Sequence, residues 1–462
     1  MCYTVLAMKT DIDTSNTNTH TPAKADRPPF PLHLRMILCG ILCGLVCGSV
    51  CVAFTWATSL ADITFHSHTM LLFGLPFAGV FVVFLYDYFR RGEDLCTDAL
   101  FRYLHGDPVL NREGPDDRVS LWLAPLIFVS TCLAYLFGGS VGRVGAALQL
   151  GGTIACFLAR RSFGSLFTDP ELRHVPLACG MAAGFTATLN MPLAGAIFGF
   201  EVLVLSRSQL FTIIPAALSS FITWGIASLA KVPYVDFHFN LTGGLTSPGM
   251  VSDSAAMASL VSSGLNWEVL LKVVLVAFAG TLAGRLFCYS RLVSVKGFEL
   301  IKNKTVRVLV GTGLVICLTL MIGVYDYNGI GFVYVDAAFT GESAMNAFLW
   351  KLILTCLTLG CGIRGGEISP TIFVGSTACF ALGCLIGLDP TLAAAIGFVG
   401  ALASVTNAPV AIGVLGCEAI CFSGESVIYF AITAVVSHVF SGTCGLYHEQ
   451  QPHRQHGKLN IP

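Results

Sequence analysis

Four charged side chains stand inside otherwise apolar sequence, and each is a candidate for chemistry: Arg143, Glu201, Glu367 and Glu418. An ionisable residue is costly in such surroundings, and in a membrane it marks an ion pathway, a proton relay or a buried pair. Glu201 and Glu418 close long apolar segments at equivalent places, which favours a structural role at a helix end or interface over a proton relay. Glu367 lies in a turn before a long uncharged run, so it is either a site residue or the buried partner of a basic residue.

Arg143 lies near the middle of a glycine-rich stretch, residues 138–152, that follows a long run without charge. Glycine allows backbone N–H groups to turn toward a ligand. A helix that begins after such a turn presents unpaired N–H groups and the positive end of its dipole. In a membrane this geometry predicts an anion site. The alternative is a pair of helices packed closely through glycine.

The sequence lacks a convincing constellation for catalysis, which needs an activated nucleophile or a metal cluster. The apolar segments contain no His-Glu-x-x-His motif and no pair of Cys-x-x-Cys motifs. Residues 138–142 superficially match a nucleophile turn, but the nearest downstream histidine, His174, begins the next apolar run. We therefore expect no enzyme activity and no cofactor.

Metal binding has two weak candidates. His448, His453 and His456 lie in a polar C-terminal stretch, where simple solvation is the favoured alternative. Cysteines recur at every fourth position from Cys39 to Cys51, either as a thiol ladder for soft metals or, as we favour, as a stripe of small residues for helix packing. We expect no metal site.

The elements that position these residues are predicted to be membrane helices. The chain has 462 residues, 55% hydrophobic and 11% charged, whereas a soluble domain has about 25% charged residues. Its net charge of −1 does not indicate a nucleic-acid partner. We predict an all-α polytopic protein of a cell or inner membrane, surrounded by the lipid bilayer.

Uncharged runs near or above the ~20 residues that span hydrocarbon are Met36–Ala61, Ile63–Tyr86, Val119–Gly142, His174–Phe200, Ser208–Ala230, Val308–Tyr325, Ile368–Leu388 and Thr391–Cys417. Shorter runs predict half-helices that meet around a site. These are Val144–Ala159, Val273–Gly284, Leu352–Ile363 and Ser426–Val439.

An internal repeat organises the chain. Residues 190–201 and 407–418 share Asn, Pro, Ala, Gly and Glu at one offset, and residues 142–153 align with residues 366–377. Two repeats that meet at broken helices are typical of transport proteins with a site near the bilayer midplane. We divide the chain into a disordered polar tail (1–35), a first membrane repeat (36–232), a second membrane repeat (233–447) and a short polar tail (448–462).

These motifs resemble the signatures of the CLC family of anion channels and transporters, the voltage-gated chloride channel family. Residues 138–145 are similar to its Gly-Arg-Glu-Gly signature, residues 183–201 to the next one, and residues 366–370 to the third. The similarity runs from about residue 36 to residue 451. The sequence similarity is greatest to the fluoride-transporting branch. It is carried by residues 123–126, 136–140, 198–202, 366–370 and 441–447.

The resemblance implies the CLC-type fold, a homodimer whose subunits contain two inverted repeats of tilted and broken helices. It implies one anion pathway per subunit, lined by N–H groups after Gly142 and around Ile368 and by the Tyr447 hydroxyl. Leu95 would lie in the first pathway segment, where the fluoride branch tends to have Met. The expected pathway residues are Leu95, Ser140, Gly142, Arg143, Val144, Gly145, Glu367, Ile368, Ser369 and Tyr447.

The gate position departs from the family pattern. The family's gating Glu follows the signature Arg, and Val144 occupies that position here. In antiporters this carboxylate enters the anion path and carries the proton, which Val cannot do. The inner proton Glu of chloride/proton antiporters falls at Val202, which is also apolar. Residues 112–115 spell the signature, but their flanks are polar, so we reject them as the gate.

We therefore expect transmembrane transport of fluoride, chloride or both, passive or weakly coupled to protons through another group such as Glu367. One alternative is a fluoride/proton or chloride/proton antiporter coupled by another carboxylate. An alternative of another class is an inactive membrane scaffold.

Overall fold

The computed structural model describes residues 32–89, 100–101, 121–163, 172–203, 207–234, 267–419, 424–442 and 445–446. Within these ranges the regular structure is helical, apart from one isolated β-bridge. Six helical stretches of the described residues are long and apolar enough to cross a membrane. The first helix begins at Leu32, before the expected start at Met36, so it includes the last residues of the predicted tail.

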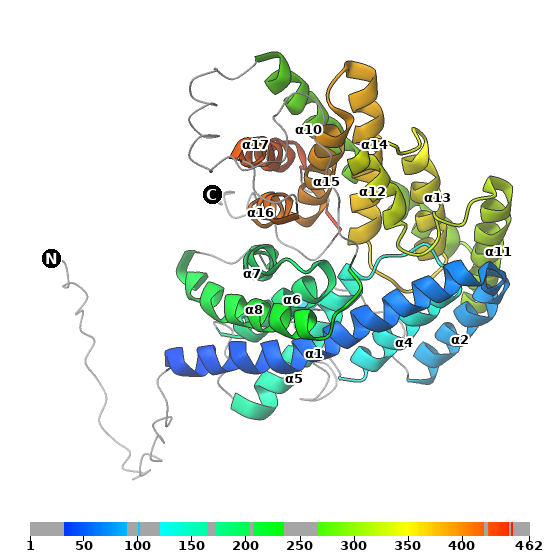
Figure 1. Ribbon diagram of the computed structural model, residues 1–462. Helices are drawn as coiled ribbons and strands as arrows, with labels where there is room; N and C mark the ends of the chain where they lie inside the picture. The colour runs from blue at the N-terminus through cyan, green and yellow to red at the C-terminus, as the bar shows by residue number, and fades with distance from the viewer. Residues whose placement is uncertain are drawn as a thin grey trace, which may run out of the picture.

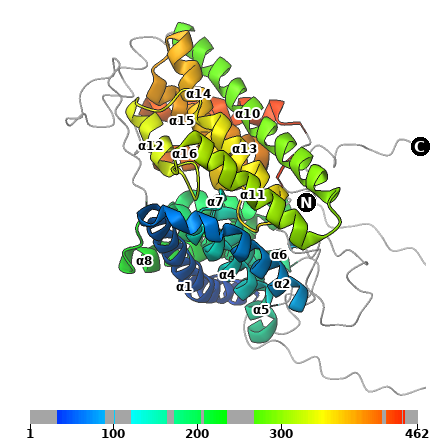
Figure 2. The ribbon, with the colours of Figure 1, turned by 90° about the vertical axis from the view of Figure 1, so that its right-hand side faces the viewer.

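The helices form two groups that follow each other along the chain and lie side by side in both views (Figures 1 and 2). The first group comprises α1 (Leu32–Ser67), η1 (Thr69–Gly74), α2 (Leu75–Tyr88), α4 (Leu123–Leu136), α5 (Val144–Phe163), α6 (His174–Leu189), α7 (Pro192–Glu201), η4 (Arg207–Thr212) and α8 (Ile213–Leu229). The second comprises α10 (Trp267–Glu299), α11 (Lys304–Ile322), α12 (Phe332–Thr340), α13 (Ala347–Gly360), α14 (Ile368–Ile386), α15 (Pro390–Thr406), α16 (Pro409–Ala419) and α17 (Gly424–Phe440).

The repeat seen in the sequence is also a repeat of close helix contacts. α5 packs on α6, and a Cβ on Gly151 would collide with the carbonyl oxygen of Gly180. α14 packs on α15 in the same way, and a Cβ on Gly375 would collide with the carbonyl oxygen of Gly397. Glycine at these equivalent positions lets the two helix backbones touch.

Two runs that the sequence presents as continuous, His174–Phe200 and Thr391–Cys417, are each broken into two helices. The breaks fall at Asn190, with φ 62°, and Asn407, with φ 53°. Asn tolerates this left-handed conformation, and the proline that follows two residues later begins the next helix. α7 and α16 are therefore short helices that start inside apolar sequence.

One predicted half-helix is wrong. The run Val273–Gly284 lies inside α10, a helix of 33 residues that is long and apolar enough to span a membrane. The charges that bound this run do not end the helix. Lys272 Nζ lies 2.7 Å from Glu268 Oε1 one turn earlier, so this cation is paired along the helix surface.

Two carboxylates tie the groups together reciprocally. Glu418, near the end of α16, accepts hydrogen bonds of 3.1 and 2.9 Å from two backbone N–H groups at the start of α7. Glu201, at the end of α7, accepts bonds of 3.1 and 2.7 Å from the start of α16. Each carboxylate thus caps the N-terminus of the helix in the other repeat. The donors are Leu193, Ala194, Val410 and Ala411.

Candidate anion site

The two glycine-rich turns are paired with each other. The Gly142 N–H donates to the Gly366 carbonyl at 2.7 Å, and the Gly366 N–H donates to the Gly142 carbonyl at 2.6 Å. These residues are equivalents in the repeat, and antiparallel pairing of equivalents is what a local two-fold axis between them produces. α5 and α14 begin at Val144 and Ile368, two residues after the paired glycines. The first turns of two helices therefore meet at one place.

Glycine is required for this meeting. A Cβ on Gly366 would lie 2.8 Å from the backbone nitrogen of Gly145 and 3.0 Å from the carbonyl oxygen of Gly142. A Cβ on Gly142 would lie 2.7 Å from Cδ of Pro370. Backbone atoms cannot move aside as a flexible side chain can, so larger residues would separate the turns.

The donors gathered here suit an anion. The first N–H groups of a helix have no intrahelical acceptor, and the side chain of Glu367 makes no capping hydrogen bond to α14. The Ser369 hydroxyl, in the first turn of α14, is fully buried and has no hydrogen-bond partner among the described residues. Unsatisfied buried donors at a helix N-terminus favour a bound anion.

The charged and polar side chains of the first glycine-rich turn, residues 138–145, contact other elements of the protein. Arg143 is 4% exposed and donates from Nη1 to the Ser59 hydroxyl of α1 at 2.6 Å, while its Nε has no partner within the described residues. The Ser140 hydroxyl donates to the Tyr327 carbonyl at 3.0 Å and lies 2.9 Å from Oγ1 of Thr355. Ser140 therefore anchors the first glycine-rich turn to Tyr327 and Thr355.

In the second glycine-rich turn, residues 365–370, the Glu367 side chain forms an ion pair. Its Oε1 lies 2.6 Å from Nη2 of Arg291 on α10, and the two side chains are only 18% and 17% exposed. A partly buried, charge-assisted contact of this length is strong. Of the two alternatives derived from the sequence for Glu367, the structure shows the pairing with a basic residue.

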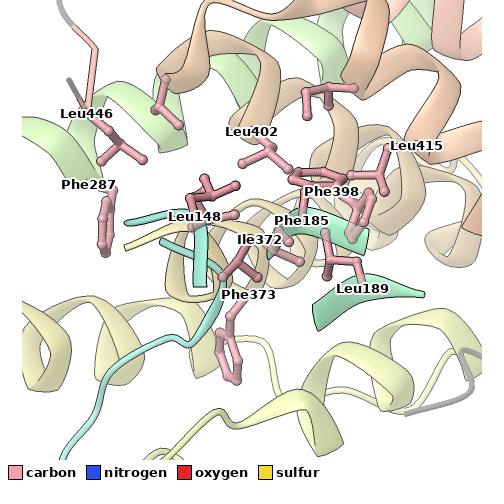
Figure 3. Packing of buried hydrophobic residues seen from close by; sticks show 14 of the residues in the cluster. Leu148, Phe185, Leu189, Phe287, Ile372, Phe373, Phe398, Leu402, Leu415 and Leu446 are labelled. Carbon is pink, nitrogen blue, oxygen red and sulfur yellow. The ribbon is translucent and has the colours of Figure 1, made fainter. Parts of the chain in front are cut away.

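The hydrophobic core encloses the site from both repeats. Figure 3 shows Leu148 of α5 near Ile372 and Phe373 of α14, with residues of α6, α15 and α16 close by. Val144 and Ile368 belong to the same cluster and are 0% and 1% exposed. The helix starts thus meet in an apolar, closely packed setting, where electrostatic interactions are strong.

Comparison with known proteins identifies the family. The model of the voltage gated chloride channel family matches residues 78–442. The chain belongs to the CLC family. A chloride/fluoride channel protein of Pseudomonas syringae pv. tomato is 29% identical over 403 residues, covering 83% of this chain and 79% of the relative. A ClC-type channel, ClcB, of Escherichia coli is 28% identical over 359 residues, covering 71% and 74%.

Solved structures agree with this CLC assignment. A CLC-type fluoride/proton antiporter superposes with a TM-score of 0.78 at 25% identity, covering 91% of this chain and 98% of that one. A slow cyanobacterial Cl⁻/H⁺ antiporter gives a TM-score of 0.68 at 18% identity, covering 88% and 94%. The chain is therefore a polytopic CLC anion-transport protein of a membrane and not an enzyme, as the sequence predicts.

The structure of this CLC chain brings together most of the expected pathway residues. Gly142, Arg143, Val144 and Gly145 lie opposite the second turn, residues 366–369. Leu95 and Tyr447 lie outside the described residues, as do residues 112–115, so those assignments stay predictions. Leu446, directly before Tyr447, is held by a 2.9 Å hydrogen bond from its N–H to the Val405 carbonyl.

Three charged residues around this CLC site were missed from the sequence: Arg291, Asp62 and Lys351. Arg291 lies among several basic residues, so the sequence does not distinguish it from its neighbours. Asp62 is the single charge between the runs Met36–Ala61 and Ile63–Tyr86, and that isolation was an available signal. Lys351, directly before another uncharged run, offered the same signal.

Proposed function

We propose that this CLC protein conducts anions passively. The observation that carries the proposal is Val144, which begins α5 beside the paired turns and is fully buried among apolar residues. Its position corresponds to that of the gating Glu in the family signature. Valine has no titratable group, so it cannot carry a proton through the site, whereas the N–H donors that would bind the anion remain.

An antiporter coupled by another carboxylate is the competing function, and Glu367 is its candidate. The 2.6 Å contact with Arg291 speaks against it. An arginine stays protonated at every physiological pH, and an adjacent positive charge favours the ionised form of a carboxylate. A Glu held in this pair is poorly suited to taking up and releasing protons during each transport cycle.

For the transported ion we propose fluoride, chloride or both. Support comes from the Pseudomonas relative, named for both ions, and from the solved fluoride/proton antiporter. Fluoride is small and keeps its water tightly, so a site for it needs dense hydrogen-bond donors. The first N–H groups of α5 and α14 and the Ser369 hydroxyl supply such donors.

We further propose a homodimer, as the CLC resemblance implies. Leu193 and Val410, at the starts of the reciprocally capped helices, are 43% and 59% exposed, and a second copy would cover apolar side chains of this kind. Light scattering of the detergent-solubilised protein measures the mass; a value for one chain contradicts the dimer.

The test of passive conduction uses purified protein in liposomes loaded with potassium fluoride or potassium chloride. Anion efflux and external pH are recorded together. We expect efflux that needs a potassium ionophore for charge balance and that moves no protons. Proton movement in fixed ratio to the anion contradicts the proposal and favours the antiporter. Absence of efflux for both ions favours the inactive scaffold.

A further inference from the structure

A loop between α11 and α12 holds the first glycine-rich turn through hydrogen bonds. Its residues Tyr327, Asn328 and Gly329 hold residues 138–140 through hydrogen bonds of 3.0, 2.7 and 3.2 Å. We call residues 327–330 the support loop. Through this loop, any fixed charge bound to it is tied rigidly to the turn that precedes α5.

One such charge is Lys351 of α13. Its side chain is fully buried, and its ammonium donates to the support-loop carbonyls of Tyr327 at 3.0 Å and Gly329 at 2.8 Å. The ring of Phe373 on α14 lies 5.4 Å from Nζ, which adds a cation–π contact. Lys351 and Ser140 therefore donate to the same carbonyl oxygen, that of Tyr327. Within the described residues Lys351 forms no ion pair.

The second charge is Asp62 of α1. Its Oδ1 accepts a 3.3 Å hydrogen bond from the N–H of Ile330, so it binds the same support loop. His66 also faces this carboxylate, with Nδ1 4.0 Å from Oδ2. Asp62 and Lys351 thus bind the same support loop, and among the described residues they form no ion pair with each other.

We propose that Lys351 and Asp62 are opposing determinants of anion affinity that never touch the anion. The inference rests on the proposed anion-conducting function. The two cations, Lys351 and Arg143, are buried, whereas the two carboxylates beside the support loop, Asp62 and Asp326, are partly exposed, so the turn before α5 stands in a positive potential. Such a potential attracts an anion over several ångströms when the intervening medium is apolar. Lys351 raises the potential, and Asp62 lowers it.

The competing interpretation is that both residues only secure the support loop. The two interpretations predict different signs for the change in anion affinity. Loss of a structural contact impairs transport whichever residue is removed, whereas loss of a determinant charge moves affinity in a direction set by that charge. Salt also screens these two charges much less than exposed ones, because Lys351 is buried and Asp62 is partly buried.

The experiment measures anion efflux from liposomes against internal anion concentration, for the parent and for Lys351→Met and Asp62→Asn. We expect Lys351→Met to raise the half-saturating concentration about tenfold, and Asp62→Asn to lower it by a factor of about three. The double variant should return toward the parent. Both shifts should persist when an impermeant salt is added.

Matched controls remove the same charges from an exposed pair, Lys304 and Asp87, whose Nζ and Oδ1 lie 3.2 Å apart. Lys304→Met and Asp87→Asn should leave the half-saturating concentration unchanged. Shifts of the same sign in Lys351→Met and Asp62→Asn, or a change in maximal rate alone, overturn the proposal. If Lys351→Met does not fold, Asp62→Asn decides, and an unchanged or raised half-saturating concentration overturns it. Absence of anion efflux through the parent protein instead overturns the proposed function, and this inference with it.

Discussion

The two glycine-rich turns share one backbone design but differ in how their charges are balanced. Gly142 and Gly366 exchange hydrogen bonds, and each precedes a helix start by two residues. Arg143, in the first turn, contacts a neutral hydroxyl, whereas Glu367, in the second, is paired with Arg291. The positive charge of Arg143 is therefore not balanced by the hydroxyl that it contacts, whereas the negative charge of Glu367 is balanced by Arg291. Symmetry of the backbone thus builds the site, and asymmetry of the side chains makes it suit an anion.

Gly366→Ala should disrupt the shared backbone design of the two turns most severely. The new Cβ would lie 2.8 Å from the Gly145 nitrogen, so the turns must separate. We expect anion efflux to fall more than tenfold and the melting temperature to drop. Gly313→Ala is the control, because a Cβ there meets nothing within 4 Å. Efflux equal to the parent's in Gly366→Ala would show that the bridge is dispensable.

Val144→Glu restores a carboxylate to the first turn and tests the gate assignment. At neutral pH the new carboxylate should compete with the anion for the N–H donors and reduce efflux about tenfold, with recovery as the pH falls and the group is protonated. The control, Val144→Gln, has similar size but no titratable proton and should lack the pH response. If the Glu variant responds to pH as the parent does, Val144 is not at the gate.

Arg291→Gln removes the neutralising partner from the second turn. The uncompensated carboxylate of Glu367 should then repel anions from the start of α14 and lower efflux several-fold, because breaking one side of a partly buried pair leaves a bare charge. Adding Glu367→Gln to this variant should restore efflux. A double variant as slow as Arg291→Gln would mean that Arg291 acts independently of Glu367. Efflux measured under identical anion gradients gives the comparison.

The smallest expected effects concern the reciprocal caps, which should count equally in the two repeats. Glu201→Gln and Glu418→Gln each weaken two charge-assisted hydrogen bonds, and we expect each to cost about 1 kcal/mol of stability. Thermal unfolding of both variants, beside Glu299→Gln at an exposed position, provides the measurement. A large effect in one repeat only would show that the caps are not equivalent.

The sequence was sufficient for features that depend on local pattern. The alignment of Gly142 with Gly366 foretold two matching turns, and Glu201 and Glu418 were correctly assigned a structural role. The run Val273–Gly284 was misread because charge alone does not end a helix when a neighbouring turn supplies its partner.

Pairings that depend on packing could not be derived from the sequence. Arg291 reaches Glu367 only because α10 lies against the start of α14, and no spacing along one helix encodes that contact. Asp62 and Lys351 meet the same loop through the packing of α1 and α13. For Leu95, Tyr447 and the division into repeats at residue 232, the sequence-based statements remain predictions.

The reciprocal caps also constrain the order in which the protein is made. Leu193 and Glu418 are 225 residues apart in the chain, and Val410 and Glu201 are 209 apart. While the ribosome is still synthesising the second repeat, α7 has no acceptor for its first N–H groups and Glu201 has no donors. The contacts that cap α7 can therefore form only after the second repeat has been synthesised, which makes their formation a late step in folding.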